Sequence, residues 1–203
     1  MTAAGVRNVD KTRIAILEAA KTVLRERGCV GLSTRDVASA AGVPLSQIHY
    51  HFGSKQGLIV AVFEYHNAQL LDRQTEMFTD PSMPISEQWD RACDYLNDDL
   101  ESGYVRVLME LWAAGWSDPQ VASVVRAGVE GWIELLAGVA RAAESRFGVL
   151  GPFDAEDIAT LVGTAFIGAE AFLLLDFESE RIPVRRALRR IGEAIKRLER
   201  ASS

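Results

Sequence analysis

The chain contains little cysteine, and the spacing of its cysteines excludes two common ways of stabilising a small domain. Among its 203 residues only Cys29 and Cys93 are cysteines, so neither a CxxC pair nor a disulfide framework is present. The first ten residues are polar and lead into a charged helical pattern, so no cleavable apolar leader is expected. These absences favour a protein of the reducing cytoplasm that uses no metal and no other cofactor.

Residue patterns that support catalysis are missing as well. The sequence has no Ser-His-Asp order, no metal-ligand spacing, no glycine-rich phosphate loop and no nucleotide-binding fingerprint. His49 and His51 are two positions apart, which on a helix directs them to different faces, so they are not expected to share a metal ion. We therefore predict no catalytic residue. An alternative is a helical enzyme that uses Glu110, Glu170 or the histidines as acid or base.

Strand patterns are also lacking. No stretch sustains the alternation of a half-buried strand, whereas apolar residues recur at helical spacing almost everywhere. We predict an all-α fold of about nine helices. The first ends at Gly28, the second follows Ser33 and stops at Gly42, the third spans 45–52, and the fourth follows Ser54 and ends near Pro81. The fifth opens at Pro84, and the others cover about 104–115, 119–147, 154–178 and 183–200.

A sharp start is predicted for the second helix. Ser33 is placed as its N-cap with Asp36 three residues later, which is the spacing of a capping box. Leu32 can pack on Val37 as a hydrophobic staple at the same end.

Charge is unevenly distributed along the chain. The formal net charge is −6, but residues 1–64 carry eight Lys/Arg and five Asp/Glu, a net +3, whereas the rest carries 14 basic and 23 acidic residues, a net −9. A basic amino-terminal part joined to an acidic body is expected of a protein in which only the first part meets phosphates.

The most informative stretch runs from Thr34 to Lys55. A helix of about eight residues, a turn containing Gly42 and a second short helix make a helix-turn-helix. Gly42 supplies a turn conformation that is costly for other residues. The residues expected to fill the small core are Val37, Val43, Ile48 and Phe52. Those left facing outward suit the major groove of DNA, where Gln pairs with adenine and apolar groups meet the thymine methyl, and they are Leu45, Ser46, Gln47, His49 and Tyr50.

Residues 12–64 resemble the DNA-binding domain of the TetR family of transcriptional regulators. The matching residues are Ile16-Leu17, Ala19-Ala20, Gly28, Thr34, Val37-Ala38, Ala41-Gly42-Val43, Tyr50-His51-Phe52 and Ser54-Lys55. The resemblance implies phosphate contacts and some base contacts for Thr34 and Arg35. It implies recognition-helix positions for Leu45, Ser46, Gln47 and His49, and positions near the DNA backbone for Tyr50, His51 and Lys55.

Two positions depart from the family pattern. Pro44 stands where a capping serine is frequent and His49 stands where a tyrosine is usual, so both bear on which DNA sequence is read. The all-helical remainder also resembles the family. We therefore expect a helix-turn-helix DNA-binding domain over residues 1–54 and a helical effector-binding and dimerisation domain over residues 55–203.

The segment 158–177 has only two charged residues and is long enough to cross a membrane. Glu170 near its middle would cost about 2.5–3.5 kcal/mol in a bilayer, so we predict no membrane span but a helix buried on all sides. One of those sides needs a partner surface, and the resemblance implies a homodimer formed by two carboxy-terminal helices of each subunit. The residues expected at this interface are Gly163, Phe166, Gly168, Leu188, Ile191 and Ile195.

Aromatic residues gather in the body, where the resemblance implies an effector pocket. We expect a mainly apolar cavity, although aromatics at this spacing also fill ordinary cores. Its expected lining is Trp89, Met109, Glu110, Trp112, Trp116, Trp132, Phe166 and Glu170. The resulting prediction is a cytoplasmic, dimeric, DNA-binding transcriptional regulator, a repressor released from a near-palindromic operator by a small, mainly apolar ligand. A further hypothesis is an architectural DNA-binding protein without an effector.

Overall fold

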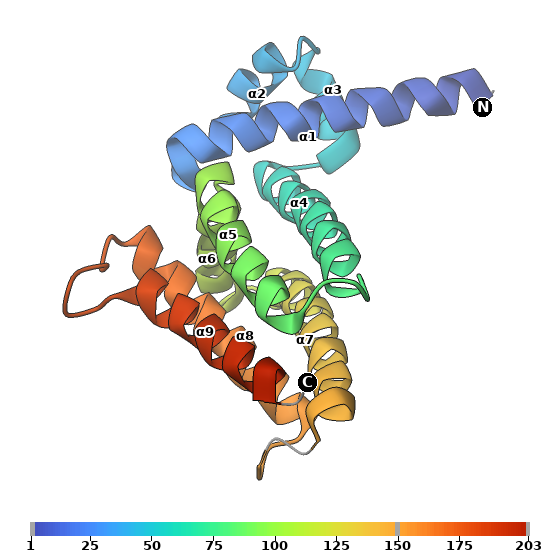
Figure 1. The fold of residues 1–203 in the computed structure, drawn as a ribbon. Helices are drawn as coiled ribbons and strands as arrows, with labels where there is room; N and C mark the ends of the chain where they lie inside the picture. Colours follow the sequence, from blue (N-terminus) through green and yellow to red (C-terminus); the bar gives the residue numbers. More distant parts are fainter. Residues whose placement is uncertain (1–2, 149–150, 202–203) are drawn as a thin grey trace. The chain divides into compact units, whose positions relative to one another are not determined.

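The computed structural model describes residues 3–148 and 151–201, with side chains described from residue 11 onward. Within these residues the chain forms nine helices and no strand, so the predicted all-α fold is confirmed (Figure 1). The helices are α1 (Ala3–Gly31), α2 (Thr34–Ala40), α3 (Leu45–Phe52), α4 (Lys55–Phe78), α5 (Ile85–Ser102), α6 (Tyr104–Gly115), α7 (Pro119–Phe147), α8 (Ala155–Leu174) and α9 (Val184–Ala201).

The helices form two compact units. The first unit comprises Met1–Ala68 with Ser102–Val125, and the second comprises Gln69–Glu101 with Arg126–Ser203. Helices α1, α2, α3 and α6 therefore lie in the first unit, α8 and α9 lie in the second, and α4 and α7 pass from one to the other. The functional division expected between residues 54 and 55 stays a prediction, because these units report packing alone.

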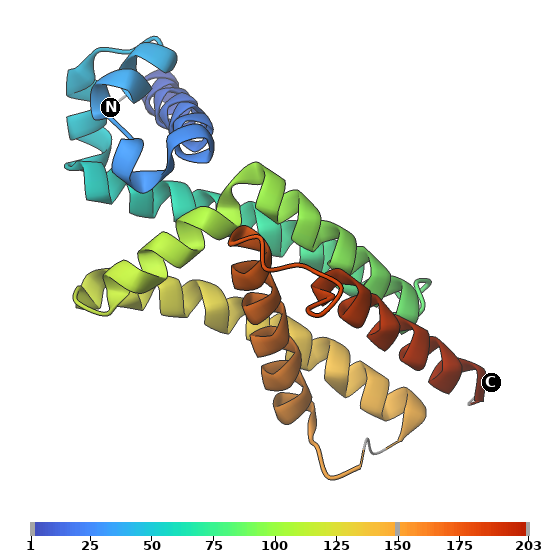
Figure 2. The ribbon, with the colours of Figure 1, turned by 90° about the vertical axis from the view of Figure 1, so that its left-hand side faces the viewer.

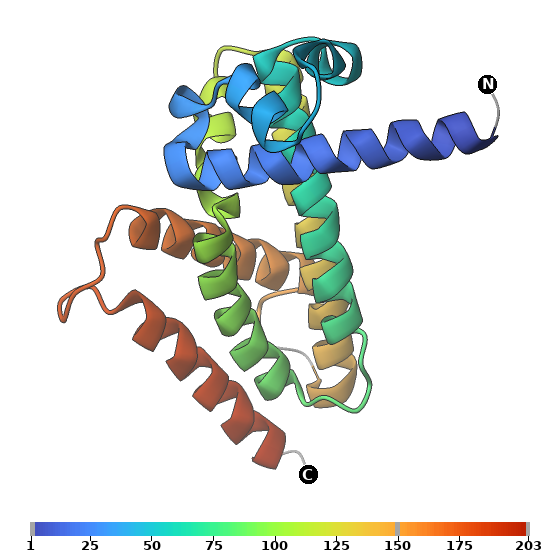
Figure 3. The ribbon, with the colours of Figure 1, turned by 90° about the horizontal axis from the view of Figure 1, so that it is seen from above.

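Helix α1 is interrupted where the sequence indicated its end. Gly28 has a φ of 68°, in the left-handed region that glycine adopts without strain. Before this break, Ile16, Leu17 and Ala20 are fully buried and Leu24 is nearly so. One apolar stripe of α1 therefore anchors the first unit, while the amino-terminal part of α1 extends past α2 and α3 (Figure 3).

The start of α2 follows the prediction only in part. Ser33 is the N-cap, as expected, and its hydroxyl oxygen accepts a hydrogen bond from the Arg35 backbone N–H at 3.3 Å. The predicted role of Asp36 in a capping box is wrong, because its carboxylate accepts a hydrogen bond from Nη1 of Arg27 at 2.7 Å. A charged partner on α1 thus replaces the weaker interaction with the cap backbone.

The core of the second unit lies where α5, α8 and α9 meet. Cys93 and Leu96 of α5 pack there with Phe166, Ala169 and Leu188. Aromatic edges fill the gaps, since the Phe166 ring stands 5.5 Å from that of Trp89 and 6.1 Å from that of Trp132, both T-shaped. The indole N–H of Trp89 donates to the Leu188 carbonyl at 2.8 Å, which ties α5 to α9 along their length (Figure 2).

Helix α8 ends at Leu174, four residues before the predicted end. Its start is fixed by a capping box in which Asp154 and Asp157 each accept from the other's backbone N–H. At its other end, Asp176 has a φ of 57°, and this left-handed residue turns the chain away from the helix axis.

Candidate nucleic-acid interface

The turn between α2 and α3 has the geometry of a helix-turn-helix. Gly42 has a φ of 65°, and a Cβ placed there would meet nothing within 4 Å, so the backbone conformation and not the available space requires glycine. The Val43 N–H donates to the Ala38 carbonyl at 3.0 Å and closes the turn. Val37 and Ile48 are fully buried between the two helices, whereas Val43 and Phe52 are only half-buried.

The face of α3 predicted to meet bases is open to solvent. Ser46, His49 and Tyr50 are exposed, with 70% of Tyr50 accessible, and Leu45 and Gln47 are half-buried at the start of the helix. The N-cap Pro44 has a φ of −60° and makes no side-chain cap hydrogen bond. The first turn of α3 therefore presents backbone N–H groups beside its side chains.

Two helix starts flank this face. Arg35 is exposed and Thr34 half-buried at the start of α2, and Lys55 is exposed at the start of α4. Ser54 caps α4 as predicted, since its hydroxyl oxygen accepts from the Gly57 N–H at 3.0 Å. Helix starts favour anions because their N–H groups and the positive end of the helix dipole point outward.

Lys55 also joins α4 to the end of α1. Its Nζ donates to the Val30 carbonyl at 3.2 Å, just after the break at Gly28. From the other side, Glu110 of α6 accepts the Cys29 N–H at 2.8 Å and the Nε of Arg106 at 3.2 Å. The chain between α1 and α2 is therefore held by charged side chains from two helices of the first unit.

His51 takes a different position from the exposed His49. Its Nε2 is buried and has no hydrogen-bond partner among the described side chains, and its ring stands 5.0 Å from that of Tyr50. Burial, followed by the nearby positive charge of Arg13, lowers the pKa of His51. The Nδ1 of His49 lies 3.4 Å from the Gly53 carbonyl at the end of α3. His51 thus belongs to the inner side of α3.

The residues expected to line an effector pocket fall into two groups. Trp89, Trp132, Phe166 and Glu170 lie in the second unit, where the Phe166 ring contacts the rings of both tryptophans. Met109, Glu110 and Trp112 lie on α6 in the first unit, and Trp116 directly follows this helix. Glu110 is engaged by Cys29 and Arg106, and Trp116 is 82% exposed. The grouping of these eight residues around a ligand stays a prediction.

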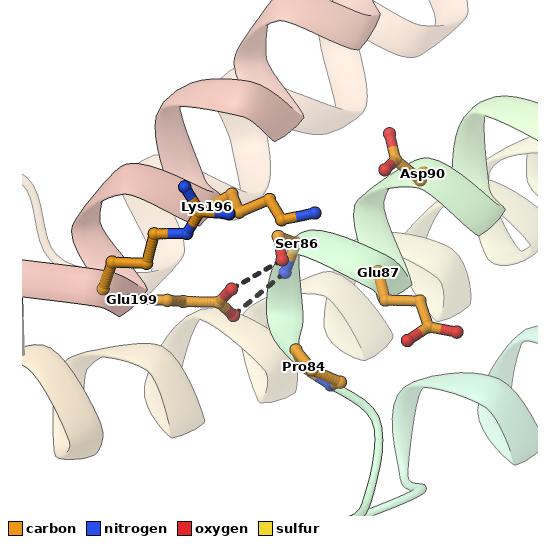
Figure 4. Close-up of a pocket in the computed structure, with 7 residues that line it drawn as sticks. Pro84, Ser86, Glu87, Asp90, Lys196 and Glu199 are labelled. Atoms are coloured by element: carbon orange, nitrogen blue, oxygen red, sulfur yellow. Dashed lines mark hydrogen bonds between the residues drawn. The ribbon is translucent and has the colours of Figure 1, made fainter. Parts of the chain in front are cut away.

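A pocket of about 500 Å³ lies elsewhere in the second unit, between the start of α5 and the end of α9 (Figure 4). Glu199 lines this pocket and accepts hydrogen bonds from the Ser86 N–H at 3.1 Å and from the Ser86 hydroxyl at 2.5 Å. Glu87 and Lys196 are among its other lining residues. None of the eight expected effector residues lines this pocket.

The expected dimer residues separate by burial. Gly163, Phe166 and Leu188 are buried within the chain, where Gly163 packs on Ile133 and Leu136 of α7, and their role at a dimer interface stays a prediction. Gly168 and Ile191 are exposed and Ile195 is half-buried. Other exposed apolar or small residues include Leu161, Ala165, Phe172 and Leu175 near or on α8, and Ala187, Ala194 and Leu198 on α9.

By length and composition alone, helix α8 could cross a membrane. The described part of the chain contains one helix of this kind. Only 28% of its apolar stretch is buried within one chain, so burial on all sides requires the expected partner surface and stays a prediction. Its exposed positions follow a spacing of three and four residues, which defines a single stripe on one face.

These features define the class of the protein: a helix-turn-helix protein with an open recognition helix flanked by two cationic helix starts. Residues 16–62 match the family model described as bacterial regulatory proteins, tetR family. Over these residues the chain therefore carries a DNA-binding domain of the TetR family of transcriptional regulators.

Individual relatives support this assignment. The chain is 30% identical over 124 residues to the HTH-type transcriptional regulator CymR of Pseudomonas putida, and the match covers 59% of each chain, less than two thirds of CymR. Among solved structures, a transcriptional regulator from Saccharomonospora viridis in complex with choline is 21% identical with a TM-score of 0.75, and 91% of this chain and 95% of that one are covered. FadR from Bacillus subtilis in complex with stearoyl-CoA is 14% identical with a TM-score of 0.70, with 88% and 96% covered. At these identities the two structures show a shared fold.

Proposed function

We propose that the chain is a cytoplasmic, homodimeric transcriptional repressor that binds a near-palindromic DNA operator and releases it when a small, mainly apolar molecule binds the body. The observation that carries this proposal is the exposed face of α3, where Ser46, Gln47 and Tyr50 stand between the helix starts at Arg35 and Lys55. Gln47 is the residue best suited to read a base, since its amide can pair with both edge atoms of adenine.

The apolar stripe on α8 and α9 supports the dimer. Leu161, Ala165, Gly168 and Phe172 line α8, and Ala187, Ile191, Ala194 and Leu198 line α9. Exposed fractions of 55% for Leu161, 45% for Phe172 and 54% for Leu198 are high for large apolar side chains. Four helices, two from each subunit, would cover these stripes and hold two recognition helices about 34–36 Å apart, one turn of DNA.

The aromatic contact in the second unit supports a ligand site in the body. Trp89, Trp132 and Phe166 form an apolar wall, and the carboxyl group of Glu170 lies one helical turn after Phe166 on α8. The relatives from S. viridis and B. subtilis were solved with choline and with stearoyl-CoA, both small molecules that carry apolar parts. A bound molecule shifts the dimer towards a spacing that does not fit two half-sites, to the extent that it binds that state more tightly.

Selection of bound fragments from random DNA duplexes tests the proposal. We expect recovery of a near-palindrome, with a log affinity that falls steeply with log salt. Gln47→Ala is expected to weaken the binding free energy by about 1–3 kcal/mol and to relax one position of the recovered sequence. Gln69→Ala changes an exposed glutamine on α4 and is expected to leave the affinity and the recovered sequence unchanged. A salt slope near zero contradicts DNA binding. Many equivalent sites with no release by any small-molecule extract would favour an architectural protein instead.

A further inference from the structure

Arg13 lies on α1, outside the helix-turn-helix, yet its guanidinium group is held beside the recognition helix. Its Cζ stands 5.7 Å from the centroid of the Phe52 ring, the last residue of α3, which is within cation–π range. Its charge also acts on His51, the neighbour of Phe52. Both contacts place Arg13 next to the turn between α3 and α4, where Lys55 begins α4.

Few acidic residues accompany this positive charge. Residues 37–63, which include all of α3 and the start of α4, contain no Asp or Glu. On α1, Glu18 lies about 140° around the helix from Arg13, and Asp10 lies one turn before Arg13, with a side chain outside the described part of the chain. Among the described side chains Arg13 forms no ion pair, in contrast to Arg27, which pairs with Asp36 at 2.7 Å.

The stacked position also prepares Arg13 for binding. The side chain is exposed, and its cation–π contact with the Phe52 ring favours one position of the guanidinium before any ligand arrives. A cation fixed in this way loses less conformational freedom when it binds an anion. Its fork of N–H groups matches two oxygens of a phosphate.

We propose that Arg13 binds a backbone phosphate of the operator where the DNA strand passes the turn between α3 and α4. This inference rests on the proposed DNA-binding function and adds α1 to the helices that contact DNA. Arg13 and Lys55 then hold the same strand from two helices, while Thr34 and Arg35 hold the strand on the opposite side of the groove.

The salt dependence of binding tests the contact. Wild type, Arg13→Gln and Lys11→Gln are titrated, at several salt concentrations, with the duplex that the wild type selects from a random pool. Each lost phosphate contact lowers the slope of log affinity against log salt by about 0.9, and the proposed homodimer loses two, so the slope falls by about 1.8 and the loss of affinity over a fourfold rise in salt becomes about 12-fold smaller. We expect this change for Arg13→Gln. Lys11→Gln removes the same charge from an exposed position of α1, about 160° around the helix from Arg13, and is expected to keep the wild-type slope.

Each outcome decides between a contact and a structural role. Arg13→Lys keeps a cation and is expected to retain the wild-type slope. If both Arg13 variants show a lower slope together with an earlier thermal transition, Arg13 has a role in folding and the proposal is overturned. An unchanged slope in Arg13→Gln, or equal decreases in Arg13→Gln and Lys11→Gln, would also overturn it while DNA binding stands. If the wild-type affinity itself does not depend on salt, the proposed function fails, and this inference fails with it.

Discussion

Replacement of Glu170 by glutamine is expected to change how the stability of the protein depends on pH. Burial, followed by the negative charge of Asp99, raises the pKa of Glu170 from 4.5 to about 8. Asp99 is also buried, and burial raises its own pKa to about 6, although Nη2 of Arg73 donates to both of its oxygens at 2.9 and 3.1 Å. The body thus contains two acids of which one keeps its proton at neutral pH.

The sign of the effect follows from the proton held by the folded state. In the unfolded chain Glu170 ionises near pH 4.5, whereas in the folded chain it stays protonated up to about pH 8. The folded state binds more protons across this window, so the free energy of unfolding falls as pH rises through it and is constant above it. A shift of about 3.5 units, at about 1.36 kcal/mol each, sets an upper bound of about 5 kcal/mol on this loss.

Urea unfolding at pH 5 and pH 9, at one fixed protein concentration, measures the effect. Glu170→Gln is expected to lie within about 1 kcal/mol of the wild-type stability at pH 5 and to exceed it by up to about 5 kcal/mol at pH 9, because glutamine has no proton to lose. Glu76→Gln removes an exposed carboxylate of α4 and serves as the control. If the free energies of unfolding of Glu170→Gln and wild type differ by the same amount at pH 5 and at pH 9, the assignment of a buried, protonated Glu170 is refuted.

Three further changes test other parts of the structure. Ile191→Asp puts a charge on the exposed stripe of α9 and is expected to give monomers with unchanged helix content by sedimentation velocity and circular dichroism, and a persistent dimer would contradict the proposed interface. Glu110→Ala removes the acceptor of the Cys29 N–H and is expected to lower the free energy of unfolding by about 1–3 kcal/mol, whereas an unchanged urea midpoint would show that this contact does not hold the chain after α1. Ser33→Ala is expected to cost about 1 kcal/mol through loss of the α2 cap, and the same midpoint as wild type would argue against that cap.

Features set by a few neighbouring residues were predictable. Gly28 and Gly42 have the positive φ values expected of them, and Ser33 and Ser54 cap the helices that they precede. These outcomes depend on the backbone of one or two residues, where glycine has no Cβ to clash and a serine hydroxyl reaches the nearest N–H groups. The helix-turn-helix could therefore be located from the sequence alone.

Partners distant in the chain were not predictable. Asp36 has the spacing of a capping residue, but Arg27 approaches it from α1 and takes its carboxylate. The eight residues expected around a ligand include three on α6, and Glu110 of that helix accepts the Cys29 N–H instead. Sequence spacing places a residue on a face of its helix, yet it does not tell which other helix meets that face.

The sequence by itself determined that the chain is all-helical, that a helix-turn-helix lies in its amino-terminal quarter, that α8 is apolar and that α9 has one apolar face, because helical periodicity and turn chemistry are local properties. Only the tertiary structure decided which side of α8 is inside. Gly163 and Phe166 pack against α7 and α5, and Leu161, Ala165 and Gly168 remain exposed. A helix that is apolar all round shows no polar face by which its inner side can be recognised, so the packing of the neighbouring helices alone makes that choice.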